Sequence, residues 1–492
     1  MLEHHQTIPK KKKEREKLRD KGQFWTPDWI AKAMISYVIK DTDLIFDPGT
    51  GTGAFFRALK MLDKNKKIKF YGIDIDSKVL QERIYEDPLC NVELRDFLKN
   101  PPNRKFKSIV ANPPYIRHHR IDKETKSFLK QLSKRITGIS IDGRAGYHIY
   151  FLLQALQLLE KNGRLAFIMP SDTCEGTFAK KLWVWITKNY CLECVVTFDE
   201  NATPFPTLDI NPIIFLIKNI TQKKEIFWVR VNKMNIDDLT YFLKSDFKDT
   251  KFENLYITTR EISEALRTGL SRHQHFNNNF KYYLSDFATV MRGIATGANN
   301  FFFLTRKQAE ELKIPNEFLK LAIGRTRDVK GDIITMEDIK ELEKRSRPTL
   351  LLSIDRPKDK IPKNILDYLH EGEKLGLPTR ALIKQRKPWY KMEKREIPPL
   401  LFAYLGRRNS RFIKNEAGVV PLTGFLCVYP KQSEKEYIDN LWKILNHPST
   451  LQNLRLVGKS YGSGAIKVEP RNLEKLPIPE NLVRKYKLEA AR

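Results

Sequence analysis

Short apolar runs alternate with amphipathic segments from residue 22 to about residue 220. The expected strands are Leu44 to Phe46, Phe70 to Ile75, Ser108 to Ala111, Arg164 to Met169, Cys194 to Phe198 and Ile213 to Ile217. Helical spacing predicts helices from about Ala54, near Lys78 to Ile84, and over Tyr147 to Glu160. This alternation predicts an α/β domain whose sheet is mostly parallel and carries helices on both faces.

The pattern divides the chain into four parts. Residues 1–21 form a polar, basic arm with four lysines in a row, and residues 22–240 hold the strand–helix alternation. Residues 241–280 are rich in Lys, Asn and Asp and are expected to connect two domains. From 281 to 492 prolines, aromatics and basic residues become denser, which predicts a second domain of the α+β class.

Charge and cysteine content narrow the class of protein. The 492 residues carry a formal charge of +29, from 88 Lys and Arg against 59 Asp and Glu. Such an excess favours a polyanionic partner, and nucleic acid is favoured over an anionic membrane surface. Five cysteines, with no second pair beside Cys191 and Cys194, indicate core thiols in a reducing compartment and no metal site. Without an apolar leader or a membrane-length run, a cytoplasmic location is expected.

A glycine-rich segment follows the first expected strand. It runs from Asp47 to Ala54 and contains Gly49 and Gly51. Glycines allow a tight turn close to a ligand, and the following helix directs its N–H groups at that ligand. The spacing also fits the dinucleotide fingerprint, so the loop alone does not separate a nicotinamide cofactor from S-adenosylmethionine.

Acidic residues follow the next two strands. Asp74 and Asp76 end one strand, and Asp96, with Phe97 after it, follows another. Each acid alone is more often a helix cap or a turn residue. Ligands, however, bind at the carboxyl edge of such sheets, where a carboxylate can accept hydrogen bonds from ribose hydroxyls. Their succession along that edge favours cofactor contacts.

Asn112-Pro113-Pro114-Tyr115 follows the third strand and carries the most specific chemistry. An aromatic exocyclic amine is a poor nucleophile because its lone pair is delocalised. Acceptors aimed at its two protons, here the Asn112 side-chain oxygen and the Pro113 carbonyl, would localise that lone pair. Tyr115 offers a face on which a base can stack, worth roughly 1–3 kcal/mol. The alternative interpretation is a proline-kinked loop that ends a strand.

In motif order the chain resembles the gamma-class, Taq-type N6-adenine DNA methyltransferases of type II restriction–modification systems. Gly22-Gln23-Phe24-Trp25-Thr26-Pro27 is similar to the N-terminal cofactor motif of that family. The resemblance implies a Rossmann-like class I fold that binds S-adenosylmethionine, with 22–240 as the catalytic domain. The cofactor-binding residues that it implies are Thr26, Asp47, Gly49, Gly51, Asp74, Asp96, Phe97 and Asn112.

Within that set the resemblance assigns individual roles. Thr26, Asp47 and Gly49 would line the methionine end of the cofactor, and Asp74 would hold the ribose hydroxyls. Asp96 and Phe97 would frame the adenine. The loop is unusually rich in threonine, and Asp74 stands where related enzymes often carry Glu, so the single contacts are less specific than the cofactor itself.

The resemblance extends to the target base and to DNA. Phe205, before Pro206, is similar to a Phe-Pro element and would sandwich a flipped adenine with Tyr115. The segments 291–302, 463–468 and 476–479 resemble the opening and the end of a target-recognition domain over 281–492. Clustered basic and aromatic residues between 380 and 414 are expected to contact DNA phosphates. Double-stranded DNA is therefore the expected partner of a monomer that can work beside a separate cognate endonuclease.

Two other functions remain open on sequence grounds. Methyltransferases of ribosomal RNA or of glutamine amides in release factors share Asn-Pro-Pro-Tyr. They are usually shorter, place an accessory domain at the N-terminus and lack the Thr26-Pro27 element. A non-catalytic DNA-specificity subunit is the other possibility, although it would not need Asn112 and the cofactor acids.

Overall fold

The computed structural model describes residues 22, 24–65, 67–78, 81–141, 143–175, 178–199, 202–205, 210–271, 280–403, 410–460 and 466–489. The expected basic arm (1–21) and the segment 463–465 lie outside this range, as do Gln23 and Pro206. Internal contacts divide the chain into two compact units, residues 1–274 and 275–492.

Within the described residues, the N-terminal unit contains one nine-stranded sheet. Its strands are β1 (Leu44–Asp47), β2 (Lys69–Asp74), β3 (Cys90–Leu94), β4 (Phe106–Ala111), β5 (Leu159–Pro170), β6 (Cys191–Phe198), β7 (Pro212–Lys218), β8 (Glu225–Val231) and β9 (Leu255–Glu261). The strand order is β3-β2-β1-β4-β5-β7-β6-β8-β9. Strands β1 to β5 are parallel to one another, whereas β7 runs antiparallel to β5 and β6. The predicted α/β class and mostly parallel sheet are confirmed.

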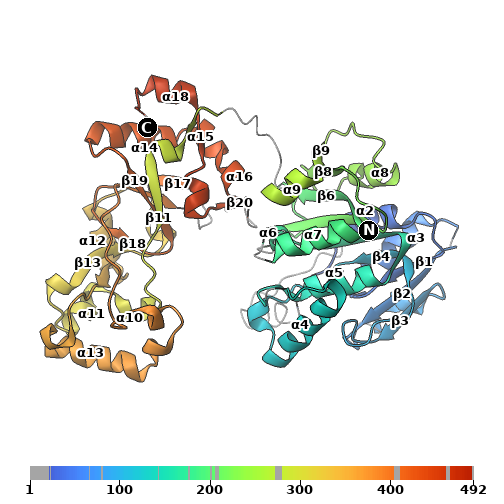
Figure 1. The fold of residues 1–492 in the computed structure, drawn as a ribbon, viewed down its shortest axis with the longest axis horizontal. Coiled ribbons are helices and arrows are strands. Elements are labelled where there is room, and N and C mark those ends of the chain that lie inside the picture. Colours follow the sequence, from blue (N-terminus) through green and yellow to red (C-terminus); the bar gives the residue numbers. More distant parts are fainter. Residues whose placement is uncertain are drawn as a thin grey trace. The chain divides into compact units, whose positions relative to one another are not determined.

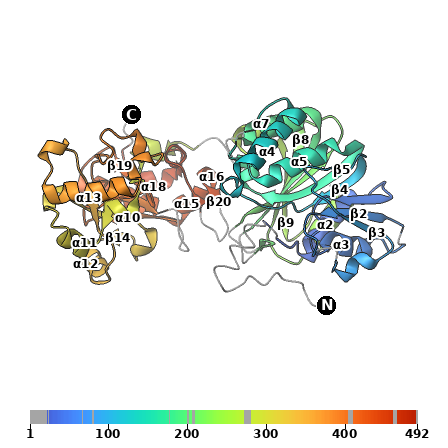
Figure 2. The same ribbon diagram turned by 90° about the horizontal axis from the view of Figure 1, so that it is seen from below.

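Helices cover both faces of this sheet (Figures 1 and 2). They are α2 (Asp28–Val38), α3 (Ala54–Leu62), α4 (Lys123–Thr137), α5 (Tyr147–Gln157), α6 (Asp172–Glu175), α7 (Ala179–Asn189), α8 (Asp238–Lys244) and α9 (Ile262–Thr268). Successive strand residues enter opposite cores: Ile45 packs with α2 and α3, and Phe46 packs with α5. Burial on both faces explains the continuous apolar runs in the sequence.

Two predicted helices differ in the structure. Between Lys78 and Ile84 there is no α-helix among the described residues, and a short 3₁₀ helix covers Arg83–Glu86. The Asp76 carboxylate accepts from the backbone N–H of Lys78 at 3.2 Å, and such local side-chain bonds compete with helix formation. The helix predicted to reach Glu160 ends at Gln157, because Leu159 already pairs with Phe106 in the sheet.

The segment 241–280, expected to connect two domains, is folded as far as it is described. The boundary placed at 240 falls inside α8, and β9 pairs antiparallel with β8 along its full length. Helix α9 follows, and its Glu264 forms a buried ion pair at 3.0 Å with Arg260 of β9. The Lys, Asn and Asp residues around β9 favour a connecting segment, although the Tyr, Ile and Thr residues of the strand itself favour pairing.

The C-terminal unit holds two main mixed sheets, which confirms the predicted α+β domain. Among its described residues one sheet has the order β11-β19-β16-β17-β14 and another β12-β15-β13-β18. The strands are β10 (Tyr282–Tyr283), β11 (Ala288–Arg292), β12 (Phe303–Leu304), β13 (Leu319–Ile323), β14 (Ile333–Ile334), β15 (Leu350–Leu352), β16 (Leu400–Ala403), β17 (Arg411–Asn415), β18 (Val420–Pro421), β19 (Phe425–Pro430), β20 (Lys459–Ser460), β21 (Ile466–Lys467) and β22 (Pro477–Ile478).

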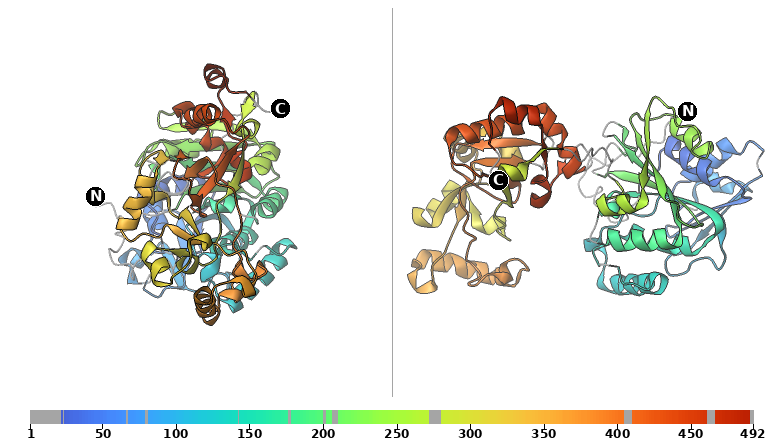
Figure 3. Two further views of the ribbon diagram at one scale, coloured as in Figure 1. Left: turned by 90° about the vertical axis from the view of Figure 1, so that its left-hand side faces the viewer. Right: turned by 45° about the horizontal axis from the view of Figure 1, so that its top comes forward.

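Helices of this unit lie against both sheets (Figure 3). They are α10 (Asn299–Phe302), α11 (Arg306–Glu311), α12 (Met336–Lys344), α13 (Lys363–Lys374), α14 (Lys435–Leu445), α15 (Pro448–Gln452), α16 (Leu454–Val457), α17 (Pro470–Leu473) and α18 (Glu480–Lys485). Strands β10 and β22 pair antiparallel, so the beginning of the unit is tied to its end.

The cysteine pair of the N-terminal unit lies in the core. Cys191 and Cys194 are free thiols buried in β6. Within the described residues, no cluster of three or more His, Cys, Asp or Glu side chains is arranged to hold a metal ion. None of the described helices combines the length and the apolar character that a membrane crossing requires.

Candidate active site

The strand order reverses between β1 and β4, which are neighbours in the sheet although β2 and β3 separate them in the chain. In an open α/β sheet, loops diverge at such a switch point and leave a crevice at the carboxyl ends of the strands. The glycine-rich loop follows β1, and Asn112 to Tyr115 follow β4. The fold therefore brings the two strongest sequence motifs to the same edge of the sheet.

The glycine-rich loop is held against β2 by backbone contacts. Gly51, at φ +51°, donates its N–H to Asp74 Oδ2 at 2.9 Å, and the Thr50 N–H donates to the Ile73 carbonyl at 3.2 Å. The Tyr85 hydroxyl donates to the Gly51 carbonyl at 2.9 Å. These bonds fix the loop before any ligand arrives, so it is preorganised for binding.

Gly72 on β2 makes room for this loop. A Cβ atom there would lie 2.0 Å from Thr50 Cγ2. We expect Gly72→Ala to destabilise the protein by about 1–3 kcal/mol through overpacking, seen as a lower midpoint of thermal unfolding. Thr50→Ser removes the clashing methyl group, so the double variant should recover most of the loss. Equal midpoints for the single and double variants would contradict this account.

Asp47 ends β1 with an unusual carboxylate. It is 1% exposed; its Oδ1 accepts from the Gly49 N–H at 3.0 Å, and its Oδ2 has no hydrogen-bond partner among the described residues. Burial raises the pKa of this carboxyl well above its usual range, although the Gly49 bond opposes that shift. A buried acceptor without a partner is costly, and here it suits a cationic ligand group.

Asp74 and Asp96 accept hydrogen bonds from backbone N–H groups in turns in this conformation. Asp74 accepts from Gly51 through one oxygen and from the Asp76 N–H through the other, at 2.9 Å each, and burial raises its pKa. Asp96 Oδ1 accepts from the N–H groups of Leu98 and Lys99. Their predicted cofactor contacts remain predictions, beside these turn-stabilising roles.

Phe97 is covered by other aromatic rings. Its side chain is 2% exposed and packs in the core, with ring centroids 6.0 Å from Phe46 and 5.2 Å from Phe151. The predicted contact of Phe97 with an adenine ring remains a prediction.

Asn112 is the best-defined side chain of the site. Its Nδ2 donates to the Phe24 carbonyl at 2.7 Å and to Thr26 Oγ1 at 3.1 Å. A carbonyl can only accept, so the amide nitrogen must face this pair, and the amide oxygen must face away from it. That oxygen, Oδ1, is buried and has no partner among the described residues. The site thus presents a fixed acceptor that the protein itself leaves unused.

Tyr115 is held at both ends. Its N–H donates to the Gly22 carbonyl at 3.0 Å, and its hydroxyl donates to the Ile168 carbonyl at 2.9 Å. Burial raises the pKa of the Tyr115 hydroxyl well above its usual range, so the residue stays neutral. Its ring lies edge-on to His148, at 5.9 Å between centroids.

Phe24 links the two aromatic residues that the sequence paired. Its ring centroid lies 5.3 Å from that of Tyr115 and 6.4 Å from that of Phe205, which is itself buried. Neither Phe24 nor His148 was predicted as part of this cluster. Phe24 lies two residues before Thr26, in a motif that the sequence analysis had already identified, and this position could have indicated it. His148 lies inside an apolar helix, where we find no sequence signal for it.

Comparisons with known proteins agree with this geometry. A model of the N-6 DNA methylase family matches residues 11–268, and one of the C-terminal domain of type II methyltransferase M.Eco57I matches residues 250–491. Type II methyltransferase M.AccI from Acinetobacter calcoaceticus is 30% identical over 470 residues, which cover 92% of this chain and 84% of that protein. Type II methyltransferase M.XamI from Xanthomonas campestris pv. amaranthicola is 22% identical and covers 94% and 86%.

Among solved structures, the fold is similar to the type IIL restriction–modification enzyme MmeI in complex with DNA. The TM-score is 0.53 at 13% identity, over 95% of this chain and 64% of the MmeI chain. This chain thus spans less than two thirds of that enzyme, and at this identity the likeness concerns the fold alone. The family match covers more than half of the chain and M.AccI matches it nearly throughout, so the chain belongs to the N-6 DNA methylase family.

Proposed function

We propose that this N-6 DNA methylase transfers a methyl group from S-adenosylmethionine to the N6 amino group of an adenine extruded from double-stranded DNA. The observation that carries the proposal is Asn112 Oδ1, a buried acceptor without a partner among the described residues, at the switch point of the sheet. Leaving such an acceptor unpaired costs free energy, which is recovered when a donor binds. The amino group of a flipped adenine is a donor of the required kind.

The chemistry follows from the acceptors. Asn112 Oδ1 accepts one amino proton and the Pro113 carbonyl accepts the other, so the nitrogen becomes more tetrahedral and its lone pair more nucleophilic. Phe24 and Thr26 hold the Asn112 amide in place, and no reorganisation is needed during the reaction. Fixed dipoles of this kind are an effective source of rate enhancement.

The extruded base would stack on Tyr115. The ring centroids of His148 and Phe24 lie 5.9 and 5.3 Å from that of Tyr115, which is 6% exposed, so the ring is already covered in this conformation. We therefore infer that the Phe24 side chain shifts when the base enters, while its carbonyl stays bonded to Asn112 and Phe205 closes the pocket. Stacking offsets part of the few kcal/mol that extrusion costs.

The class I fold and the family imply use of S-adenosylmethionine, which supplies a methyl group on a positively charged sulfur. The chain fits this group: Asp47 Oδ2 is a buried carboxyl oxygen without a partner among the described residues, suited to accept from the ammonium of the methionine end. Gly49 and Gly51 give close backbone access beside it. Asp74 and Asp96 are proposed to reach the ribose and the adenine.

Thr26 was expected to contact the methionine end, and in this conformation its hydroxyl oxygen accepts from Asn112. We expect Thr26→Val to lower kcat about 2- to 13-fold, the effect of losing one hydrogen bond of about 0.5–1.5 kcal/mol, with little change in KM for S-adenosylmethionine. Thr26→Ser keeps the oxygen and should retain most of the activity. A rise in KM for the cofactor at unchanged kcat would instead assign Thr26 to the methionine end.

The deciding experiment is single-molecule sequencing of genomic DNA from a host that expresses the protein, beside an Asn112→Ala control. N6-methyladenine confined to one short motif, and absent in the control, is the expected result. Unmodified DNA from a host whose folded protein binds S-adenosylmethionine would reject the DNA assignment, and methylation assays on RNA and on glutamine peptides would then follow.

We further propose a monomer that acts in the cytoplasm, with or without a separate cognate endonuclease.

A further inference from the structure

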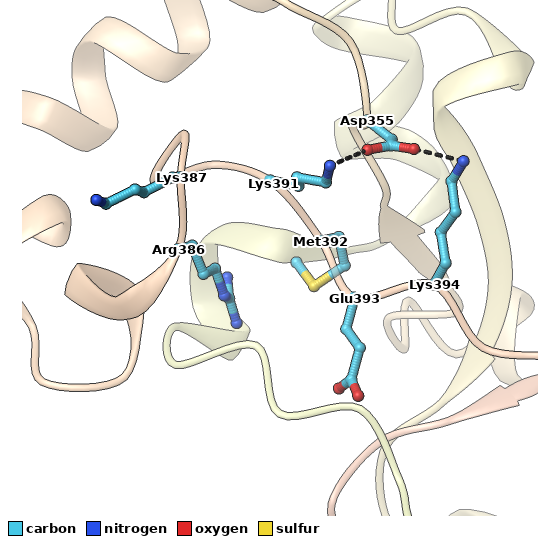
Figure 4. Close-up of a pocket in the computed structure, with 7 residues that line it drawn as sticks. All are labelled: Asp355, Arg386, Lys387, Lys391, Met392, Glu393 and Lys394. Atoms are coloured by element: carbon cyan, nitrogen blue, oxygen red, sulfur yellow. Dashed lines mark ion pairs between the residues drawn. The ribbon is translucent and has the colours of Figure 1, made fainter.

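A basic pocket of about 320 Å³ lies in the C-terminal unit (Figure 4). We call it the basic pocket; its charged lining consists of Arg386, Lys387, Lys391, Lys394, Asp355 and Glu393. Four cations face two carboxylates, which leaves a formal charge of +2. The pocket belongs to the region between residues 380 and 414 for which no individual DNA contacts could be assigned from the sequence.

The basic side chains stand on a rigid support. Tyr390 and Met392, between them in the chain, are each 1% exposed and belong to the core of this unit. The Met392 N–H donates to the Ile354 carbonyl at 3.2 Å, which ties the segment to the end of β15. Cations on a preorganised segment lose little conformational entropy on binding a ligand.

The two carboxylates already have cationic partners. Asp355 lies between Lys391, at 2.8 Å, and Lys394, which pairs with its other oxygen (Figure 4). These two ammonium groups lower the pKa of Asp355 to about 2, so it stays ionised. Glu393 pairs with Arg395 at 2.7 Å. Arg395 does not line the pocket, and counting it with the lining raises the formal charge to +3, carried by Arg386, by Lys387 and by the second of the two lysines that share Asp355.

Arg386 connects the pocket to a segment near the start of the C-terminal domain. Its Nη2 donates to the carbonyls of Ala295 and Thr296, at 2.5 and 2.9 Å, in the turn that leads to α10. Its Nη1 is buried and has no hydrogen-bond partner among the described residues. An anionic oxygen in the pocket would supply the missing acceptor.

We propose that the basic pocket binds a phosphate of the DNA backbone and thereby sets the register of the C-terminal domain on the duplex. This inference rests on the proposed function, because it takes DNA as the substrate. A phosphodiester matches the excess charge and the unused guanidinium donor, and contacts of this class position a protein without reading sequence. The same chemistry would suit free phosphate, which the test must separate.

The test compares two double variants of the full-length protein. Lys387→Gln with Lys391→Gln removes two pocket charges and leaves Asp355 paired with Lys394. Lys340→Gln with Lys443→Gln removes the same charge from exposed positions on α12 and α14, outside the pocket. Binding of a fluorescent duplex of arbitrary sequence is measured by anisotropy at several salt concentrations, after thermal unfolding shows that each variant is folded.

The pocket variant should lower the slope of log affinity against log salt by about 0.9, since one neutralised phosphate is lost. The control pair should keep both the wild-type slope and the wild-type kcat. Equal slopes for pocket variant and wild type would overturn the proposal while leaving methylation intact. The proposal would also fail if inorganic phosphate shifted the unfolding midpoint of the wild type while the pocket variant kept the wild-type salt slope for DNA binding. A wild type that neither binds nor methylates DNA would instead reject the proposed function.

Discussion

Replacing Asn112 by alanine should lower kcat for adenine methylation by about 10²–10³-fold, the usual cost of removing one preorganised polar group that stabilises the transition state. The side chain is positioned by Phe24 and Thr26, and its oxygen has no other partner among the described residues. Truncation removes the interaction made with the reacting amino group, together with the two Nδ2 hydrogen bonds to Phe24 and Thr26. DNA affinity should be preserved, which anisotropy can measure beside the initial rate of methylation.

Asn112→Asp provides the matched control. It keeps an oxygen towards the base but places the second one where Nδ2 now donates to the Phe24 carbonyl at 2.7 Å. Two acceptors at that distance repel, so the aspartate variant should also lose activity, despite its similar shape. An aspartate variant with near wild-type kcat would show that the orientation of the Asn112 amide is not fixed by Phe24 and Thr26.

The sequence predicted those features that follow from period and local chemistry. Strands β1, β2 and β4 are apolar on both faces, and a glycine-rich turn or Asn-Pro-Pro follows two of them. Parallel pairing brings those turns to one edge of the sheet, so the neighbourhood of Asp47 and Asn112 follows from the strand pattern alone. The C-terminal domain could be predicted only as a class, because its short strands lack a clear period.

Long-range contacts account for what the sequence could not supply. Asn112 Nδ2 donates to two oxygens that lie 86 and 88 residues away in the chain. No residue near Thr26 in the sequence indicates that its hydroxyl oxygen accepts a hydrogen bond from Asn112 instead of contacting a cofactor. Strand β9 pairs with the open edge of β8, and its Tyr, Ile and Thr residues favour a strand, but the Lys- and Asp-rich residues before it predict a connecting segment. The helix expected near Lys78 fails for a local reason, the carboxylate bonds of Asp74 and Asp76, which compete with helical hydrogen bonds.

Asp47→Asn should weaken S-adenosylmethionine binding roughly 10- to 100-fold, the value of one charged hydrogen bond of about 1.5–3 kcal/mol. It should also make the ligand-free protein more stable at neutral pH. The two effects have one cause, because the carboxylate that suits a cationic ligand is buried and incompletely paired without it. Titration calorimetry with the cofactor and thermal unfolding without it measure the two quantities separately.

The pH dependence distinguishes this cause from a simple packing change. Burial raises the pKa of Asp47 above its unfolded value of about 3.9. Below about pH 3.9 the carboxyl is protonated in both the folded and the unfolded state, so its titration does not lower the free energy of unfolding. Stability is then lost as the pH rises towards the folded pKa. Asparagine does not titrate, so the stability gain of the variant should grow from about pH 4 to about pH 7. A gain that is equal at both pH values, or a variant that binds the cofactor as the wild type does, would contradict the role given to this oxygen.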